Sequence, residues 1–227
     1  MIKDRVKSFL SWNIVDPIVH NLKEIVYQNI FNNQCLNAGI SNDFYPVGDA
    51  ANYSLLYLVF RILKENELET IIELGSGQTT LLIDRIKRTT TNHICYEDDH
   101  HWFKLLEPKL QNTDYRYTEL SNYIIDDISC DWYADVEYKD FDFLLVDGPR
   151  GVERFSRLGC CELISRSTGG EFIIVFDDSE RRGEQDTIAH VCGILKRKGS
   201  KFKISQLRGK KEQTIISTGR YSSARYS

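Results

Sequence analysis

Apolar residues recur at two different periods along the chain, and the period changes near residue 70. Before that point they repeat at helical spacing, which predicts a helical N-terminal region. Asp16 and Pro17 mark a helix start, because proline is favoured at the first helical position. A polar stretch over 32–46 is rich in turn residues and interrupts the pattern. The predicted helices cover residues 2–10, 15–30 and about 49–64.

From residue 70 onward, short apolar runs alternate with segments of helical periodicity. Such alternation predicts an α/β domain with a mainly parallel sheet and helices on both faces. The last two runs flank a short basic turn, which predicts a closing antiparallel hairpin. Residues 126–140 are expected to form a long acidic loop. The expected strands cover residues 70–74, 93–96, 115–120, 141–146, 171–176, 201–207 and 213–218, and the expected helices cover 79–88, 101–110, 152–165 and 182–198.

The composition is that of an ordinary globular protein, with 41% apolar and 27% charged residues. A net charge of -4 gives no global electrostatic reason to bind DNA or RNA, so we expect no nucleic-acid partner. Basic residues near the C-terminus, among them Lys210 and Lys211, are expected to be solvated. The sequence shows no signal peptide and no apolar run near the roughly 18 residues of a membrane-spanning helix. Six cysteines without a C-x-x-C pair indicate reduced thiols in a cytoplasmic protein.

The first expected strand ends in a turn with two glycines, Gly75 and Gly77, just before a helix. Glycines allow a sharp turn and a close approach of a ligand to the backbone, and the helix start offers free N–H groups. Ser76 and Thr79 belong to the same turn and are further candidate cofactor contacts. A plain strand-to-helix turn is the alternative interpretation.

The second expected strand ends in a pair of carboxylates, Glu97 and Asp98. Glu97 follows Gly77 by twenty residues, a spacing at which a carboxylate can accept hydrogen bonds from both hydroxyls of a ribose. Asp98 could take the same role or cap the next helix. The glycine turn and the acidic pair together indicate a pocket for an adenosine-type cofactor. A dinucleotide-binding fingerprint has a third glycine at the position of Thr80, so its absence disfavours NAD as the cofactor.

The pattern Glu73-x-Gly75-x-Gly77, followed by Glu97, resembles the first motif of class I S-adenosylmethionine methyltransferases. The resemblance covers about residues 45–219. It implies a Rossmann-like fold with a seven-stranded, mostly parallel sheet in the order 3-2-1-4-5-7-6, in which strand 7 is antiparallel. It also implies that Glu73 lies near the methionine end of S-adenosylmethionine and that Glu97 binds the ribose.

This resemblance divides the chain into three parts. We expect a class I methyltransferase domain over 46–219, preceded by a helical extension over 1–45 that covers the acceptor site as a lid. Residues 220–227 are expected to form a flexible tail. The N-terminal helices could also support a homo-oligomer.

A second segment, Val146-Asp147-Gly148-Pro149, resembles glycan O-methyltransferases of the glucuronoxylan type and of bacterial polysaccharide clusters. The resemblance implies that Asp147 lies beside the transferring methyl group, contacts the cofactor and acts as a catalytic base. Its alternative role is that of a turn former. Arg150 and Arg154 follow at a spacing of four residues, at which the two could share one face of the helix start. They are candidate anchors for an anionic acceptor, or ordinary surface ion-pair formers.

The fifth expected strand ends in Asp177 and Asp178, which should face Asp147 across the cofactor mouth. The three carboxylates resemble the Mg²⁺ site of catechol-type O-methyltransferases, with an aspartate in place of its asparagine. They are candidate ligands of Mg²⁺ or another divalent ion such as Mn²⁺ or Ca²⁺. Asp178 is also a candidate catalytic residue, and capping of the following helix is its alternative role.

The expected function is therefore S-adenosylmethionine-dependent O-methylation of a sugar or glycan hydroxyl. Four alternatives stay open at this point. They are a catechol-like O-methyltransferase acting on small molecules, an NAD-dependent oxidoreductase, a protein or nucleic-acid methyltransferase, and a non-catalytic interaction module on a methyltransferase fold. The negative charge disfavours a nucleic-acid substrate.

Overall fold

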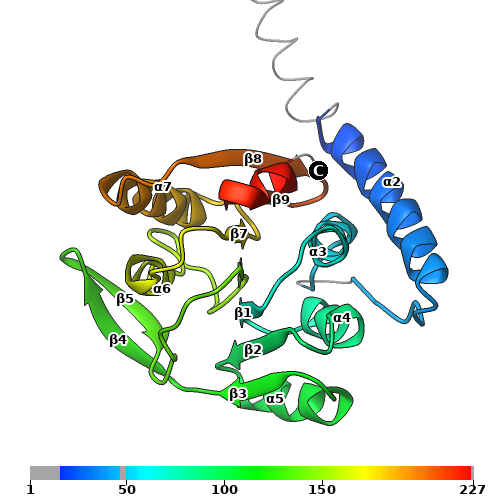
Figure 1. The fold of residues 1–227 in the computed structure, drawn as a ribbon, viewed down its shortest axis with the longest axis horizontal. Coiled ribbons are helices and arrows are strands. Elements are labelled where there is room, and N and C mark those ends of the chain that lie inside the picture. The colour runs from blue at the N-terminus through cyan, green and yellow to red at the C-terminus, as the bar shows by residue number, and fades with distance from the viewer. Residues whose placement is uncertain (1–15, 47–49, 226–227) are drawn as a thin grey trace, which may run out of the picture.

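The computed structural model describes residues 16–46 and 50–225. Its centre is a seven-stranded sheet in the order β3-β2-β1-β6-β7-β9-β8 (Figure 1). All neighbouring strands are parallel except β9, which runs antiparallel to both β7 and β8. The expected sheet order and its closing hairpin are thus confirmed. The strands are β1 (Thr70–Leu74), β2 (Asn92–Glu97), β3 (Asp114–Tyr117), β6 (Phe143–Val146), β7 (Ile173–Phe176), β8 (Phe202–Arg208) and β9 (Glu212–Thr218).

Helices cover both faces of this sheet, as Figure 1 shows. One core lies between the sheet and helices α3 and α4, and a second lies between the sheet and helices α6 and α7. The central strands β6 and β7 are buried along their whole length, which is typical of parallel strands with helices on both sides. The helices are α2 (Asp16–Asn37), α3 (Tyr53–Glu65), α4 (Gln78–Ile86), α5 (His100–Leu106), α6 (Cys160–Arg166) and α7 (Arg182–Arg197), with short 3-10 helices at Glu107–Lys109 and Gly219–Arg225.

Register places the ends of the central strands at one edge. Val146, the last residue of β6, lies opposite Leu74 of β1 and Phe176 of β7. The turns that follow these three strands therefore meet. The candidate residues after each strand are brought together for this reason.

Helix α2 covers Asp16–Asn37 of the described residues and so continues seven residues beyond the expected end at residue 30. It packs against α3 through Phe31 and Cys35, which are fully buried. Its apolar residues elsewhere are largely exposed, among them Ile18, Val19, Leu22, Ile25, Val26 and Leu36. The helix expected over 2–10 lies outside the described residues.

Two expectations about local structure are wrong. Residues 120–133 form a hairpin of β4 (Leu120–Ile125) and β5 (Ile128–Tyr133). The turn and second strand of this hairpin occupy the first half of the loop expected over 126–140. Asp126 and Asp127 both have positive φ, as a two-residue hairpin turn requires, but they lack the glycine that usually signals it. The helix expected over 152–165 is confined to Cys160–Arg166, because Phe155 and Arg157 adopt left-handed φ values that a right-handed helix excludes.

The C-terminal segment also differs from the expected flexible tail. Its described part forms the 3-10 helix Gly219–Arg225, in which Tyr221 is buried and donates a hydrogen bond to the carbonyl of Glu67. All six cysteines lie within the described residues and are free thiols. Among the helices that the structure describes, none is long and apolar enough to cross a membrane.

Candidate active site

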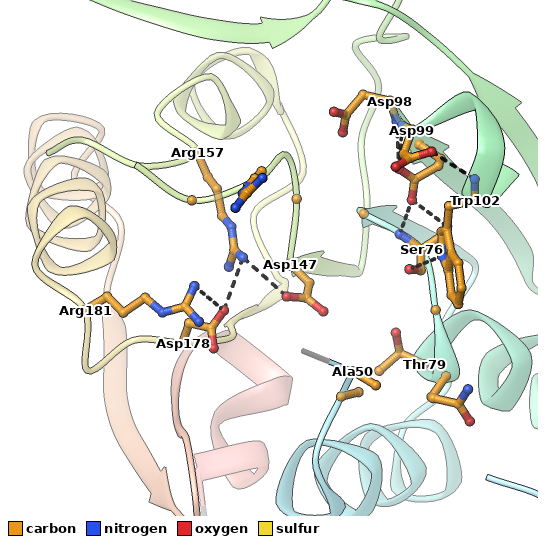
Figure 2. A pocket seen from close by; sticks show the side chains of 18 residues that line it. Ala50, Ser76, Thr79, Asp98, Asp99, Trp102, Asp147, Arg157, Asp178 and Arg181 are labelled. Carbon is orange, nitrogen blue, oxygen red and sulfur yellow. Dashed lines mark hydrogen bonds and ion pairs between the residues drawn. The ribbon is translucent and has the colours of Figure 1, made fainter. Parts of the chain in front are cut away.

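A cavity of about 890 Å³ opens where β1, β2, β6 and β7 end. Its volume suits a small-molecule ligand. Figure 2 shows two groups of side chains facing each other across it, with Asp147, Arg157 and Asp178 on one side and Ser76, Asp98 and Trp102 on the other. The lining residues include Gly75, Ser76, Gly77, Thr79, Glu97, Asp98, Trp102, Asp147, Gly148, Arg150, Arg157, Asp178 and Arg181.

Bare backbone forms the floor between the two groups. Gly75 has a φ of 82°, and a Cβ built on it would lie 2.7 Å from the backbone nitrogen of Gly148. Only glycine tolerates both the conformation and this approach. A Cβ on Gly77, in contrast, would meet no heavy atom within 4 Å. The glycine turn therefore leaves open space above Gly77 for a ligand.

Glu73 does not line the cavity, contrary to the expected contact with the methionine end of a cofactor. Its carboxylate is fully buried and accepts a 2.5 Å hydrogen bond from Thr79 Oγ1. Its other oxygen lies 3.0 Å from His93 Nε2. Glu73 thus supports the glycine turn from the side away from the cavity. The hydroxyl of Thr79 is engaged in this hydrogen bond to Glu73.

Glu97 ends β2 at the cavity wall and organises one end of the site. One carboxylate oxygen accepts hydrogen bonds from the backbone nitrogen and the hydroxyl of Ser76, at 3.0 and 2.6 Å. The other accepts from the backbone nitrogens of Asp98 and Asp99, at 2.9 and 2.8 Å. Four donors hold the carboxylate in place. A ligand hydroxyl could take the position of the Ser76 hydroxyl as a donor to this carboxylate.

Asp98 stands beside Glu97 and also lines the cavity. Burial, followed by the charge of Glu97, raises the pKa of Asp98 to about 6. The expected capping role belongs instead to Asp99, whose carboxylate accepts from the backbone nitrogen of Trp102. Sequence reasoning had not singled out Asp99.

Trp102 provides an aromatic wall next to this carboxylate. Its indole Nε1 donates a 3.0 Å hydrogen bond to the carbonyl of Ser76, which fixes the ring beside the glycine turn (Figure 2). The side chain is 40% exposed and borders the cavity. An aromatic face of this kind suits stacking against a planar base.

The opposite end of the cavity is acidic. Asp147, Asp177 and Asp178 each place a carboxylate oxygen within 4.8 Å of the other two, as the sequence predicts. Asp147 and Asp178 line the cavity, whereas Asp177 is fully buried behind them. Burial, and next the charge of Asp177, raise the pKa of Asp147 above the usual aspartate range, although Arg157 opposes this shift.

Arg157 holds this acidic end together and was missed in the sequence. The side chain is 4% exposed, and its guanidinium lies 3.4 Å from both Asp147 Oδ1 and Asp178 Oδ2. It also donates to the carbonyls of Val146, the last residue of β6, and of Asp177, the first residue after β7. The helix expected over 152–165 gave no sign of this role. The side chain of Arg157 points toward the cavity because the backbone of Arg157 is left-handed.

Lys211 is the second cation at the acidic end. Its Nζ lies 3.3 Å from Asp177 Oδ2 and 3.1 Å from Asp178 Oδ1. Burial alone would lower the pKa of Lys211, but Asp177 and then Asp178 raise it. The expectation that Lys211 is solvated is therefore wrong, since its side chain is only 14% exposed. Arg181 adds a half-exposed cation at 2.9 Å from Asp178 Oδ2.

The acidic cluster does not fit a divalent ion as it stands. Three carboxylates supply the oxygen ligands that Mg²⁺ prefers. However, Arg157 already bridges Asp147 and Asp178, and Lys211 bridges Asp177 and Asp178. An ion placed among the carboxylates would lie against two buried positive charges, so no chemical step is assigned to a metal.

The two arginines expected to bind an acceptor separate in the structure. Arg150 is exposed and lines the cavity mouth. Arg154 is not among the lining residues, and its Nε lies 2.5 Å from Asp186 Oδ2. They share no helix face because the chain is irregular there. Arg181 is the second arginine at the mouth.

The sequence matches no protein-family model and no curated relative. Among solved structures, the chain is similar to a Staphylococcus aureus protein provisionally described as a caffeoyl-CoA O-methyltransferase. The TM-score is 0.54 at 11% identity, over 88% of this chain and 100% of that one. An O-methyltransferase from Bacillus cereus in complex with SAH gives 0.51 at 12% identity, over 96% and 100%. A Klebsiella pneumoniae protein provisionally described as an O-methyltransferase gives 0.51 at 16%, over 86% and 90%. This likeness shows a shared Rossmann-like fold.

Proposed function

We propose that the protein is an S-adenosylmethionine-dependent O-methyltransferase. One observation carries the proposal: a single cavity joins a hydroxyl-accepting carboxylate, Glu97, to a partly buried carboxylate of raised pKa, Asp147, across a floor of bare glycine backbone. The first feature suits a ribose, and the second suits a base near the transferred group. The fold shared with the compared methyltransferases supports the same proposal.

The residues at the Glu97 end fit the adenosine part of the cofactor. Glu97 would accept hydrogen bonds from the ribose in exchange for the Ser76 hydroxyl. Trp102 would stack on the adenine, and the open space above Gly77 would take the rest of the molecule. Glu73 would act only indirectly, by holding Thr79 and the turn in place.

When bound, the cofactor supplies an electrophilic methyl carbon. Asp147 would accept the proton of the acceptor hydroxyl, since a raised pKa makes a carboxylate a better base near neutral pH. Arg157 would fix the direction of this carboxylate. Asp178, held by Arg157, Arg181 and Lys211, would position the acceptor side of the cavity.

For the acceptor we propose an anionic sugar or glycan, such as a uronic acid or a phosphosugar. Arg150 and Arg181 lie at the cavity mouth, where guanidinium groups can bind a carboxylate or phosphate. Arg154 leaves this list because it pairs with Asp186 away from the cavity. A catechol-like acceptor is the competing outcome of the test below.

The oxidoreductase alternative fits the site less well. Thr80 replaces the third glycine of a dinucleotide turn, and its buried hydroxyl accepts a hydrogen bond from the nitrogen of Gly77. A non-catalytic module would have no need for an ordered cluster of three aspartates and two buried cations. These observations favour the methyltransferase.

Location and assembly also belong to the proposal. Six free thiols suit a reducing compartment, which favours the cytoplasm. The exposed apolar side chains of α2, such as Leu22, Ile25 and Val26, favour a homo-oligomer through this helix. Light scattering on the purified protein would measure the assembly directly.

A methyl-transfer screen tests the acceptor. Purified protein is given S-adenosylmethionine with a labelled methyl group and a panel of uronic acids, phosphosugars, neutral sugars and phenols. We expect transfer to an anionic sugar, and a loss of kcat/KM of roughly 10- to 150-fold in Arg150→Ala, the scale of about 1.5–3 kcal/mol for a charged hydrogen bond. Arg154→Ala is the matched control and should retain activity. Methylation of phenols that is indifferent to both substitutions would contradict the glycan assignment.

A further inference from the structure

We propose that Lys211 supplies from within the chain the positive charge that a divalent ion would bring to Asp147, Asp177 and Asp178, so that this acidic cluster works without metal. The inference deepens the proposed function and rests on it for its catalytic consequence. Its structural part, the exclusion of a divalent ion by Lys211, can be tested without any methyl transfer.

The position of the ammonium carries the proposal. Lys211 Nζ lies between two carboxylates, at 3.3 Å from Asp177 Oδ2 and 3.1 Å from Asp178 Oδ1. The remaining oxygen of Asp177 accepts a 2.8 Å hydrogen bond from Gln213 Nε2. Both oxygens of Asp177 are therefore occupied by donors of β9 and the turn before it. An entering ion would have to displace Lys211 to reach them.

Arg157 closes the cluster from the other side. Its guanidinium spans Asp147 and Asp178, and both side chains of the Arg157–Asp178 pair are 4% exposed. Arg157 and Lys211 thus face three carboxylates, and Arg181 adds a half-exposed third cation at 2.9 Å from Asp178 Oδ2. The cluster is close to electrical balance, and a further double charge would be repelled by these cations.

A polar network fixes the turn that carries Lys211. The carboxylate of Glu24 on α2 accepts from the backbone nitrogen of Lys210 at 3.0 Å. It also accepts from Asn52 and from the backbone of Ser54, both near the start of α3. Ser54 and Asn52 in turn bond to the side-chain amide of Gln213. The ammonium is therefore held in advance at the carboxylates.

This arrangement makes Lys211 a positioning residue. It holds Asp177 and Asp178 at a fixed separation behind Asp147, and it acts on the reacting groups through them. Removing it would leave a buried, under-compensated acidic cluster with the oxygen ligands that Mn²⁺ accepts. The variant should then gain an affinity for divalent ions that the wild type lacks.

Titration with Mn²⁺, followed by electron paramagnetic resonance, tests this directly. We expect no specific Mn²⁺ site in the wild type. In Lys211→Ala we expect a single site whose Kd is at least about tenfold lower than the Kd of any residual binding to the wild type, a difference of about 1.4 kcal/mol. Lys211→Arg should restore the exclusion. Lys210→Ala, a change at the exposed neighbour, should resemble the wild type, and Asp177→Ala in the Lys211→Ala background should abolish the new site.

Two results would overturn the proposal: a Mn²⁺ site in the wild type that Asp177→Ala removes, or a folded Lys211→Ala that gains no site. The wild-type titration decides even if Lys211→Ala does not fold. Where methyl transfer is observed, wild-type turnover should be unchanged in EDTA, and inhibition reversed by Mg²⁺ or Mn²⁺ would also overturn it. Absence of methyl transfer to any acceptor would count against the proposed function and leave the Mn²⁺ result standing.

Discussion

The backbones of Gly75 and Gly148 touch: a Cβ on Gly75 would lie 2.7 Å from the nitrogen of Gly148. The contact follows from the pairing of β1 with β6, whose carboxyl ends are adjacent. It connects the turn whose Ser76 donates hydrogen bonds to Glu97 with the turn that carries Asp147. The two chemical ends of the cavity are thereby fixed to each other through backbone.

We expect Gly75→Ala to destabilise the protein by about 1–3 kcal/mol, because the added methyl group meets backbone atoms that cannot move aside. The positive φ of Gly75 adds to this cost. The measurement is the free energy of unfolding in urea. Gly170→Ala is the control, since a Cβ there would meet nothing within 4 Å. Equal stability of the two variants would show that the two turns do not pack as described.

The sequence predicted the strands because each buried strand is a short apolar run, as in Phe143–Val146 and Ile173–Phe176, whereas the order of the strands was implied by the resemblance to class I methyltransferases. Strand ends also identified Glu97, Asp147 and Asp178, since carboxyl ends of parallel strands share one edge of the sheet. For these residues, the position directly after a predicted strand was sufficient to predict that they lie at the cavity.

The two buried cations could not be predicted in this way. Arg157 turns inward only because its own backbone is left-handed, and local pattern carries no sign of that. Lys211 reaches Asp177 because β9 pairs with β7, a contact between residues far apart in the chain. The position of Glu73 outside the cavity depends on a similar contact: its partner His93 lies on the neighbouring strand and holds the carboxylate beneath the turn.

Arg157→Met should destabilise the protein by about 3–5 kcal/mol, because it leaves two carboxylates without their buried counter-charge. Arg154→Met is the matched control. Its pair with Asp186 lies at the surface and is screened by solvent, so its loss should cost far less stability than the loss of Arg157. Thermal and urea unfolding measure both. Similar losses in the two variants would mean that Arg157 does not organise the acidic end.

Asp98 should make stability depend on pH. The folded protein holds a proton on Asp98 up to about pH 6, whereas the ordinary aspartate value is 3.8. Because the folded state binds this proton more tightly, its contribution to stability is lost as pH rises through this window and stays lost above it. Asp98→Asn should therefore be more stable than the wild type at pH 7, by about 1 kcal/mol after allowance for solvent screening, and this difference should vanish well below the unfolded pKa of 3.8.

The exposed Asp131→Asn is the control for this comparison. Melting temperatures of all three proteins across the pH range provide the measurement. A constant difference between Asp98→Asn and the wild type at every pH would show that Asp98 titrates alike in the folded and unfolded states.

Asp147→Asn should lower kcat by roughly 100- to 10,000-fold, the usual contribution of a positioned base, and leave cofactor affinity unchanged. In the wild type, kcat should rise with pH to a plateau, because the base acts only when deprotonated. The raised pKa places this rise above the usual aspartate range. Residual activity of the variant should lack this dependence. An identical pH profile in both proteins would assign the base to another group.

The central claim is that the cavity binds S-adenosylmethionine, and calorimetric titration with its product S-adenosylhomocysteine tests it most directly. Gly77→Ala provides the comparison, because a Cβ there meets no protein atom and would project into the open space where we place the ligand. We predict one ligand bound per wild-type chain, at least about tenfold weaker binding to Gly77→Ala, and no saturable heat with NADH. Saturable binding of NADH with none of S-adenosylhomocysteine would contradict the account.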